Sequence, residues 1–351
     1  MNAVSFKNTL LKSFFSKRFF VFSTTIFLVT IVFIIIAFEV YNSIPAEPVG
    51  IDQVFLVRSG TTLSEVAGDL QEKGIIRSSL LFTILARVKG LSRQIKAGEY
   101  CLNSSMPPSN ILSALSKGAI ITYPVTIPEG FSRRQIGELL EENDLLDKET
   151  FLLLTENEDI AGRYGIKGHG LEGYLYPDTY RFARSQSAIS IIDTMVNRFF
   201  EVIEPFKESI EASNMNLDEI VTLASIIEKE TACPEERPII ASVFLNRLNR
   251  GMRLESDPTV IYGIKDFNGN IKKKHLSENT PYNTYVIRGL PPGPIASPGF
   301  DAIKAVLLPS NTDYFYFVSK NDGTHYFSES LKEHNRAVQI YQKNRKRINK
   351  K

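Results

Sequence analysis

The chain has 351 residues, of which 43% are hydrophobic and 23% charged, a composition typical of a folded globular protein rather than a disordered or fibrous one. A net charge of +2 gives no strong electrostatic preference, and we expect no nucleic-acid partner. With four histidines, two distant cysteines and no glycine-rich phosphate loop, the sequence predicts neither a metal site nor a cofactor.

The N-terminal segment has the pattern of a membrane anchor. Residues 1–18 contain four basic and no acidic side chains, and residues 19–38 contain no charged side chain. About twenty apolar residues cross a bilayer as a helix, and the basic flank places the N-terminus in the cytoplasm. A cleaved signal peptide is the alternative, but no good cleavage site follows the long apolar run. We predict a cytoplasmic N-terminus over 1–18, a transmembrane helix over 19–38 and a linker over 39–50.

A small α+β unit is predicted for residues 51–119. Val54–Val57 has the composition of a strand, Gly60 that of a turn, and Thr62 that of a helix N-cap. This strand–turn–helix pattern resembles the LysM-like module, a small peptidoglycan-binding fold. A structural spacer that holds the rest of the chain away from the membrane is the alternative.

Part of this pattern recurs in residues 122–155, where Gly130 and Ser132 correspond to Gly60 and Thr62. Two copies are too few for a solenoid. The recurrence therefore predicts two small α+β units that follow one another along the chain.

The two cysteines, Cys101 and Cys233, lie far apart in the sequence. Two cysteines form no disulfide framework, so we expect two separate buried thiols. Pairing in an oxidising compartment stays open at this point.

Residues 168–181 are dense in glycine, tyrosine and proline. Aromatic rings interleaved with acids are suited to a sugar-binding wall, because sugar faces stack on rings and hydroxyl groups need polar partners. Equally, Tyr174, Tyr176 and Tyr180 are suited to the core of a loop–strand junction. The sequence does not separate these two interpretations.

The stretch from Asn216 to Gly263 holds the candidate for chemistry. Asn216 and a glutamate three residues later predict the start of a helix. At about 100° per residue, Glu230 falls on the apolar side of this helix, Lys229 on the opposite side and Glu228 at the edge of the apolar arc. Burial raises the pKa of a carboxyl group, which is what a general acid at neutral pH needs. The alternative is that Glu230 pairs with Arg247 or Arg253.

At this point several ordered blocks resemble one family. They are LASIIEKET, SVFLNRL, GMRLESDPTVIYG, TPYNTY and GLPPGPIASPG, with LEGYLYPDTY before them and YFVS and SLKEHN after them. Together they resemble the endolytic murein transglycosylase family (MltG/YceG-like) over about residues 50–345. The resemblance implies an α+β protein with one N-terminal transmembrane helix, a LysM-like module over 51–119, a YceG-like catalytic domain over 120–345 and a basic tail over 346–351.

The resemblance also implies a function. The family is anchored in the bacterial inner membrane with its catalytic domain in the periplasm. It cleaves nascent peptidoglycan strands internally, between N-acetylmuramic acid and N-acetylglucosamine, and leaves 1,6-anhydro-N-acetylmuramoyl ends. Such cleavage would limit strand length during wall elongation, with peptidoglycan synthases as candidate protein partners.

The catalytic glutamate of the family is the second Glu of its EKET block, which maps onto Glu230. The implied mechanism needs one carboxyl group, so no carboxylate pair at glycosidase spacing is required. The residues that we predict to hold the sugars are Asn246, Asp257, Tyr262, Tyr282 and Asn283. For Asp257, an Asx-turn with the following Pro and Thr is the favoured alternative.

Two other classes of function remain open. A hydrolase would use a second carboxylate to activate water, with Asp257, Asp178 or Glu172 as candidates. A non-enzymatic scaffold that binds the wall would hold Glu230 in a salt bridge.

Overall fold

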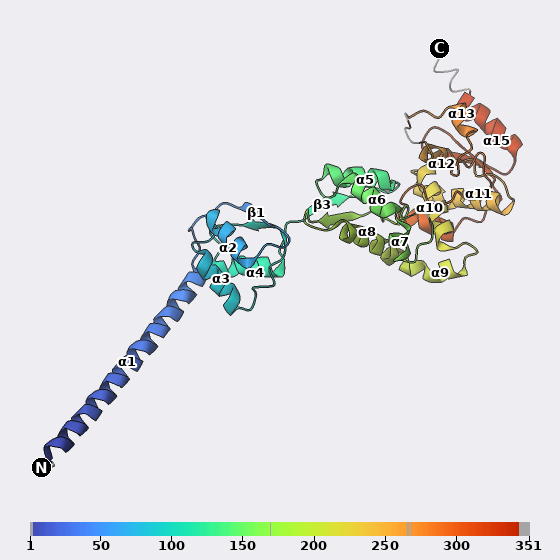
Figure 1. The fold of residues 1–351 in the computed structure, drawn as a ribbon. Coiled ribbons are helices and arrows are strands. Elements are labelled where there is room, and N and C mark those ends of the chain that lie inside the picture. Colours follow the sequence, from blue (N-terminus) through green and yellow to red (C-terminus); the bar gives the residue numbers. More distant parts are fainter. Residues whose placement is uncertain (1–2, 169, 265–266, 268, 344–351) are drawn as a thin grey trace. The chain divides into compact units, whose positions relative to one another are not determined.

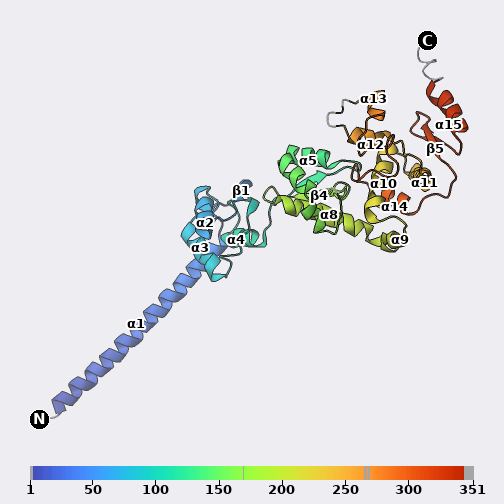
Figure 2. The same cartoon turned by 45° about the vertical axis from the view of Figure 1, so that its right-hand side comes forward.

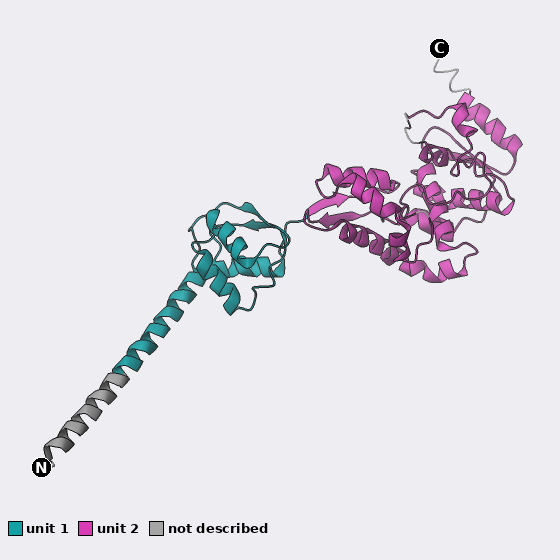
Figure 3. Ribbon diagram, viewed as in Figure 1, with its two compact units in different colours: residues 1–122 teal, residues 123–351 magenta. Residues whose placement is uncertain are grey.

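The chain forms two compact units, residues 1–122 and residues 123–351 (Figure 3). The computed structural model describes residues 3–168, 170–264, 267 and 269–343, with side chains from residue 22 onward. The predicted basic tail, 346–351, lies outside the described residues. Along the chain, the boundary between the two units follows residue 122, three residues after the boundary predicted between residues 119 and 120.

The first unit begins with the long helix α1, Ala3–Ser43 (Figure 1). Its segment Phe22–Ser43 is long and apolar enough to cross a membrane, by length and composition. The predicted linker over 39–50 was wrong at its start, because residues 39–43 continue the helix. Glu39 alone does not end a helix, and the first proline, which does, comes only at Pro45.

The remainder of that linker is held against the first unit. The Tyr41 hydroxyl donates to the Ser78 carbonyl (2.9 Å), and the Arg77 guanidinium donates to the Ala46 carbonyl (2.9 and 3.0 Å). The Glu47 amide donates to a backbone carbonyl of the unit as well (3.0 Å). Residues 44–47 are thus fixed by hydrogen bonds rather than left as a free linker.

The body of the first unit is a two-stranded antiparallel sheet covered by helices. Phe55 pairs with Tyr100, and both side chains are buried, whereas Cys101 on the next position of its strand is exposed. The expectation of a buried thiol at Cys101 was therefore wrong, because successive side chains of a strand alternate between its faces. Both cysteines are free thiols. The elements are β1 Gln53–Val57, α2 Leu63–Glu72, α3 Ser79–Val88, β2 Gly98–Leu102 and α4 Pro108–Lys117.

The second unit begins with the order of elements found after α1 in the first unit, with one added short helix, α7, before the returning strand. The β3/β4 pair is again antiparallel, and in Figures 1 and 2 it lies between α5 on one side and α8 on the other. Gly130 has a positive φ (75°), like Gly60 (82°), and Ser132 caps α5 through a capping box, as Thr62 caps α2. The predicted recurrence is confirmed. The elements are β3 Tyr123–Thr126, α5 Arg133–Glu142, α6 Lys148–Glu156, α7 Glu158–Gly162, β4 Thr179–Phe182 and α8 Ala188–Ile203.

The tyrosines of residues 168–181 belong to the core. Tyr174, Tyr176 and Tyr180 are 2%, 8% and 7% exposed, and Tyr174 packs edge-on against Phe199 at 5.0 Å between ring centroids. The Tyr174 hydroxyl donates to the carboxylate of Asp218, near the start of the helix α10 that is described below. Of the two interpretations left open by the sequence, the structure favours the core.

The rest of the second unit surrounds one buried helix, α10, Leu217–Glu230. Every residue from Ile220 to Ile227 is buried, and α10 contacts α11, α12 and α14. Residues 277–299 contain no helix or strand and pass beside these helices. The further elements are η1 Glu204–Phe206, α9 Lys207–Ala212, η2 Pro234–Glu236, α11 Arg237–Asn249, α12 Asp257–Tyr262, α13 Lys273–Leu276, α14 Phe300–Leu307, β5 Tyr316–Ser319, β6 His325–Ser328, α15 Leu331–Val338 and the π-helical η3 Gln339–Lys343.

Candidate active site

Glu230 is the last residue of α10, and its position is fixed from the other end of the helix. Asn216 caps α10 by the predicted capping box, in which Asn216 Oδ1 accepts from the Glu219 amide (3.0 Å) and Glu219 Oε2 accepts from the Asn216 amide (2.8 Å). From that start the helix continues without interruption to Glu230. A carboxylate at a helix C-terminus faces the negative end of the helix dipole, which disfavours its charged form.

The two residues before Glu230 have other partners. Glu228 forms a buried ion pair with Arg237 (2.7 Å) and accepts from the Gly299 amide (3.0 Å). The exposed Lys229 donates to the Gly130 carbonyl (3.1 Å). Both residues therefore hold α10 to neighbouring segments. Among the ion pairs of the described residues, Glu228 has a partner and Glu230 has none.

A buried serine holds the Glu230 carboxyl group. The hydroxyl of Ser256, which is 1% exposed, donates to Glu230 Oε1. Burial raises the pKa of Glu230 from 4.5 to about 7; the Ser256 hydrogen bond and the charge of Arg247 oppose this shift, and the charge of Asp257 adds to it. Glu230 can thus carry a proton at neutral pH and also release it, which suits a group that acts as acid and then as base.

Ser256 is itself fixed by two buried threonines. Its amide donates to Thr284 Oγ1 (3.0 Å), and its carbonyl accepts from Thr259 Oγ1 (2.7 Å). The two threonine hydroxyls are hydrogen-bonded to each other (2.8 Å), and both residues are fully buried. The backbone of Ser256 is therefore held in place beside Glu230.

The predicted alternative of a salt bridge at Glu230 was wrong. Among the described residues, Glu230 forms no ion pair within 4 Å with Arg247 or Arg253. Arg247 instead donates to the carbonyls of Phe315 (2.7 Å) and Leu254 (2.8 Å) and lies 3.6 Å from the Glu255 carboxylate. Its charge acts on Glu230 only from a distance.

A second acid lies on the exposed side of the site. Asp257, at the start of α12, is exposed, and its Oδ1 accepts from the Tyr285 hydroxyl (2.7 Å). Its negative charge reaches Glu230, since it contributes to the raised pKa there. The predicted alternative for Asp257 was a local turn; Pro258 follows it at the start of a short helix instead.

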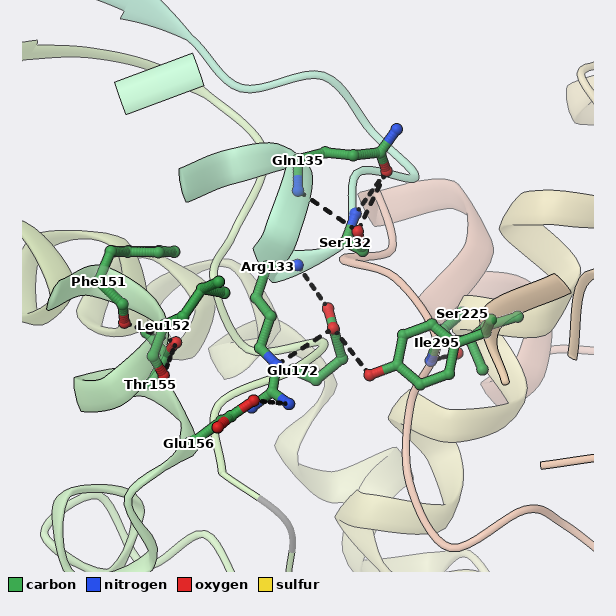
Figure 4. A network of polar contacts seen from close by, with 11 residues as sticks. Ser132, Arg133, Gln135, Phe151, Leu152, Thr155, Glu156, Glu172, Ser225 and Ile295 are labelled. Atoms are coloured by element: carbon green, nitrogen blue, oxygen red, sulfur yellow. Dashed lines mark hydrogen bonds and ion pairs between the residues drawn. The ribbon is translucent and has the colours of Figure 1, made fainter. Parts of the chain in front are cut away.

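Beside this centre lies a cavity of 660 Å³, a size typical of ligand pockets. Its wall includes a third acid, Glu172, which is 4% exposed (Figure 4). Glu172 accepts from the Arg133 amide (2.9 Å) and the Tyr262 hydroxyl (3.0 Å), and the Arg133 guanidinium lies 3.7 Å away. Burial raises the pKa of Glu172 to about 7 against these contacts.

The short helix α12 joins the cavity to the Glu230 centre. Ser256 precedes its first residue and bonds to Glu230, whereas Tyr262 is its last residue and bonds to Glu172. Six helical residues rise about 9 Å. Half-buried Glu230 and buried Glu172 are thus hydrogen-bonded to residues at opposite ends of this short helix.

The predicted substrate-binding residues fall into two groups. Asp257 adjoins Glu230, and Tyr262 lines the cavity with Tyr282 packed on it at 4.8 Å between ring centroids. Asn246 instead donates to the carbonyls of Thr312 (2.7 Å) and Tyr314 (3.0 Å). Asn283, 1% exposed, donates to the carbonyls of His275 (3.0 Å) and Glu278 (2.7 Å). These contacts give the two asparagines a role in holding loops, and they lend no support to sugar binding there.

Sequence reasoning missed Ser256 and Arg133 as parts of the site. Ser256 lies in the block GMRLESDPTVIYG, but a serine before Asp-Pro has the pattern of a turn. Of the carboxylates considered for a hydrolase, Glu172 does line the cavity, and Asp178 is paired with Arg198 (2.8 Å).

Comparison with known proteins agrees with these observations. The YceG-like family model matches residues 55–340. The chain is 35% identical to an endolytic murein transglycosylase of Bacillus subtilis over 303 residues, covering 81% of this chain and 83% of that one. It is 31% identical to an endolytic murein transglycosylase of Streptococcus pneumoniae, covering 80% of this chain and 57% of that one.

A solved structure is similar as well. The crystal structure of a yceG-like protein from Listeria monocytogenes matches with a TM-score of 0.57 and 32% identity, covering 81% of this chain and 98% of that one. The chain therefore belongs to the YceG-like family.

Proposed function

We propose that the protein is a membrane-anchored endolytic peptidoglycan lytic transglycosylase. The observation that carries the proposal is the state of Glu230: a single carboxyl group with a pKa raised to about 7, held by Ser256 and free of an ion pair within the described residues. A curated relative of similar length, from Bacillus subtilis, carries the name endolytic murein transglycosylase.

In the proposed reaction, Glu230 acts twice. Its protonated form gives the proton to the oxygen of the glycosidic bond between N-acetylmuramic acid and N-acetylglucosamine, and the bond from C1 to that oxygen breaks. The N-acetyl group of the muramoyl residue assists at C1. The Glu230 carboxylate then takes the proton of the C6 hydroxyl as its oxygen bonds to C1, which closes the 1,6-anhydro ring and restores the acid.

Ser256 and Asp257 support this cycle in different ways. The Ser256 hydroxyl can donate to the carboxylate that forms after the first step, while the charge of Asp257 keeps the pKa of Glu230 high beforehand. Our candidates for sugar contacts are exposed Asp257, Tyr262 at the cavity, and Tyr282, which packs on Tyr262. Asn246 and Asn283 act in this proposal by fixing the loops beside them.

The location and the first unit complete the proposal. The span Phe22–Ser43 anchors the protein in the inner membrane, with both compact bodies on the periplasmic side. The strand–helix–helix–strand order of residues 53–102 supports a LysM-like module that binds peptidoglycan without chemistry of its own. Cleavage of nascent strands near the membrane would limit strand length, and peptidoglycan synthases are the protein partners that this implies.

Product analysis tests the reaction. Digested peptidoglycan examined by mass spectrometry should contain 1,6-anhydro-N-acetylmuramoyl ends at internal cleavage sites and no new reducing ends, because the C6 hydroxyl rather than water attacks C1. New reducing ends would assign the chain to the hydrolases, with Asp257 as the candidate for activating water.

A further inference from the structure

The cavity beside Glu230 has an excess of cations that the protein does not neutralise. Three basic side chains line it, Arg133, Arg134 and Lys229. Its two acids, Glu156 and Glu172, are both engaged by Arg133, at 2.8 and 3.7 Å. One guanidinium therefore contacts both carboxylates. The lining has three basic and two acidic side chains, a formal net charge of +1, and Arg134 and Lys229 pair with neither acid.

Those two cations have no carboxylate within ion-pair distance among the described residues. Lys229 donates to the Gly130 carbonyl, a neutral acceptor, and is exposed. Arg134, the second residue of α5, is exposed as well, and the ion pairs of the described chain do not include it. Both can meet a ligand without breaking an existing salt bridge.

Arg133 adds a donor with no acceptor among the described residues. Its Nη1 is buried and has no hydrogen-bond partner within that part of the chain, whereas Nη2 bonds to Glu156 and the amide to Glu172 (Figure 4). A buried donor without an acceptor costs free energy, which an acceptor supplied by a ligand would recover. The guanidinium is fixed in place by its two acids, so that this donor is oriented beforehand.

We propose that this cavity binds a carboxylate carried by a muramoyl residue of the glycan strand, with Arg134 and Lys229 as its cationic contacts and Arg133 Nη1 as a hydrogen-bond donor. The inference rests on the proposed function. Because α12 joins the cavity to Glu230, the bound muramoyl residue lies next to the cleaved bond. The carboxylate has two possible sources, the stem peptide or, where the peptide has been removed, the lactyl group of the sugar.

Three forms of one substrate test the proposal. Uncross-linked strands that carry stem peptides are compared with the same strands after their carboxylates are converted to methylamides, and with strands stripped by an amidase, which leaves only lactyl carboxylates. We expect kcat/KM of the wild type to be about threefold to tenfold higher on the native strands than on the methylamide strands, as for two exposed ion pairs. The difference should shrink at high salt.

The variants separate the cavity from general charge effects. The Arg134→Gln/Lys229→Gln double variant should lose the preference for native over methylamide strands. Lys207→Gln removes one exposed cation from α9, outside the cavity, and should keep it. Equal kcat/KM of the wild type on native and methylamide strands, or an unchanged preference in the double variant, would overturn the proposal. Stripped strands that behave like native strands show that a lactyl carboxylate can take the place of a stem-peptide carboxylate in the cavity. Stripped strands that behave like methylamide strands show that the cavity binds only the stem-peptide carboxylate.

A binding measurement keeps this test independent of the chemistry. The full-length Glu230→Gln protein is titrated calorimetrically with short strands of the native and methylamide kinds. Tighter binding of the native strands, abolished by the double substitution, supports the cavity even if product analysis refutes transglycosylation. Equal affinities overturn the cavity even if anhydro products are found.

Discussion

The strand–helix–helix–strand arrangement occurs twice in this protein, over residues 53–102 and 123–182, and only the second copy contributes to the candidate active site. Both copies have an antiparallel strand pair, a turn glycine with positive φ and a capping box. They differ in the connection before the returning strand. It comprises residues 89–97 in the first copy. In the second copy it is the longer stretch 157–178, which includes the added helix α7 and carries Glu172.

The turns of the two copies also have different surroundings. A Cβ added at Gly60 would meet nothing within 4 Å, whereas one at Gly130 would meet the side chains of Lys229 (3.4 Å) and Glu228 (3.5 Å). The second turn is therefore packed against the end of α10, where Glu230 lies. The two copies thus share the same strand pair, turn and helix cap. The second copy reaches the candidate active site through its longer connection, residues 157–178, and through its turn at Gly130, which packs against α10.

The largest expected effect comes from the acid itself. Glu230→Gln keeps the size of the side chain but cannot deliver a proton, so glycan cleavage should fall by at least about 10²–10⁴-fold while the fold stays intact. Release of anhydro-ended fragments measures it. Near-normal turnover would mean that Glu230 is not the catalytic acid, so the second copy would no longer be the one that lies beside the reaction site.

Glu228→Gln is the matched control on the same helix. Because it breaks the buried pair with Arg237, it should lower the free energy of unfolding by about 1–3 kcal/mol. Cleavage by the folded variant should remain close to that of the wild type. A loss of activity equal to that of Glu230→Gln would mean that the two carboxylates act together.

The pH dependence is the next largest effect. Glu230 must be protonated for the first step, and its pKa is about 7 rather than 4.5. Thus kcat/KM should be level below about pH 6 and fall about tenfold per pH unit well above pH 7. Asp257→Asn removes a charge that raises this pKa and should move the descending limb to lower pH. Ser256→Ala removes a bond that lowers it and should move the limb to higher pH. Identical profiles in all three proteins would exclude Glu230 as the group that titrates.

Removing the first copy tests whether it contributes to substrate binding and not to the chemical step. Deletion of residues 51–119 from the anchored protein should leave kcat nearly unchanged and raise KM for long strands about tenfold or more, because a second attachment to the strand is lost. Steady-state kinetics on long and short strands measure this. A folded deletion variant without turnover at saturating substrate would show that the first copy takes part in the reaction.

The smallest effect compares the two turn glycines directly. Gly60→Ala and Gly130→Ala each force alanine into a left-handed conformation, which costs about 1–2 kcal/mol. Thermal unfolding should show a similar loss in each case. Only Gly130→Ala should lower kcat/KM, severalfold, because its new methyl group lies against Lys229 and Glu228. Equal activities would mean that the packed turn is not needed for catalysis.

Local periodicity explains what the sequence could predict. The capping residue Asn216 and the helical repeat placed Glu230 on the inner side of α10, because these signals depend only on nearby residues. The recurrence of Gly60 and Thr62 as Gly130 and Ser132 predicted the two copies for the same reason.

What the sequence could not predict depends on contacts between distant residues. Ser256 bonds to Glu230, and Thr284 bonds to Ser256, across 26 and 28 positions of the chain. Asn246 and Asn283 have the chemistry of sugar ligands, but backbone carbonyls elsewhere in the fold occupy their amides. The end of α1 lies five residues beyond the predicted one, because the uncharged run ends at Phe38 whereas the helix continues to Ser43, just before the first proline.

The way in which α1 ends has a consequence for the reach of the enzyme. Its last turns pass into residues that are hydrogen-bonded to the first unit through Tyr41, Ala46 and Glu47, without a flexible spacer. For a chain anchored by α1, the first unit then stands at a fixed height above the bilayer. If this unit binds peptidoglycan as we propose, it reaches only the glycan strands within that layer, and the length of the anchor then restricts binding to strands near the membrane.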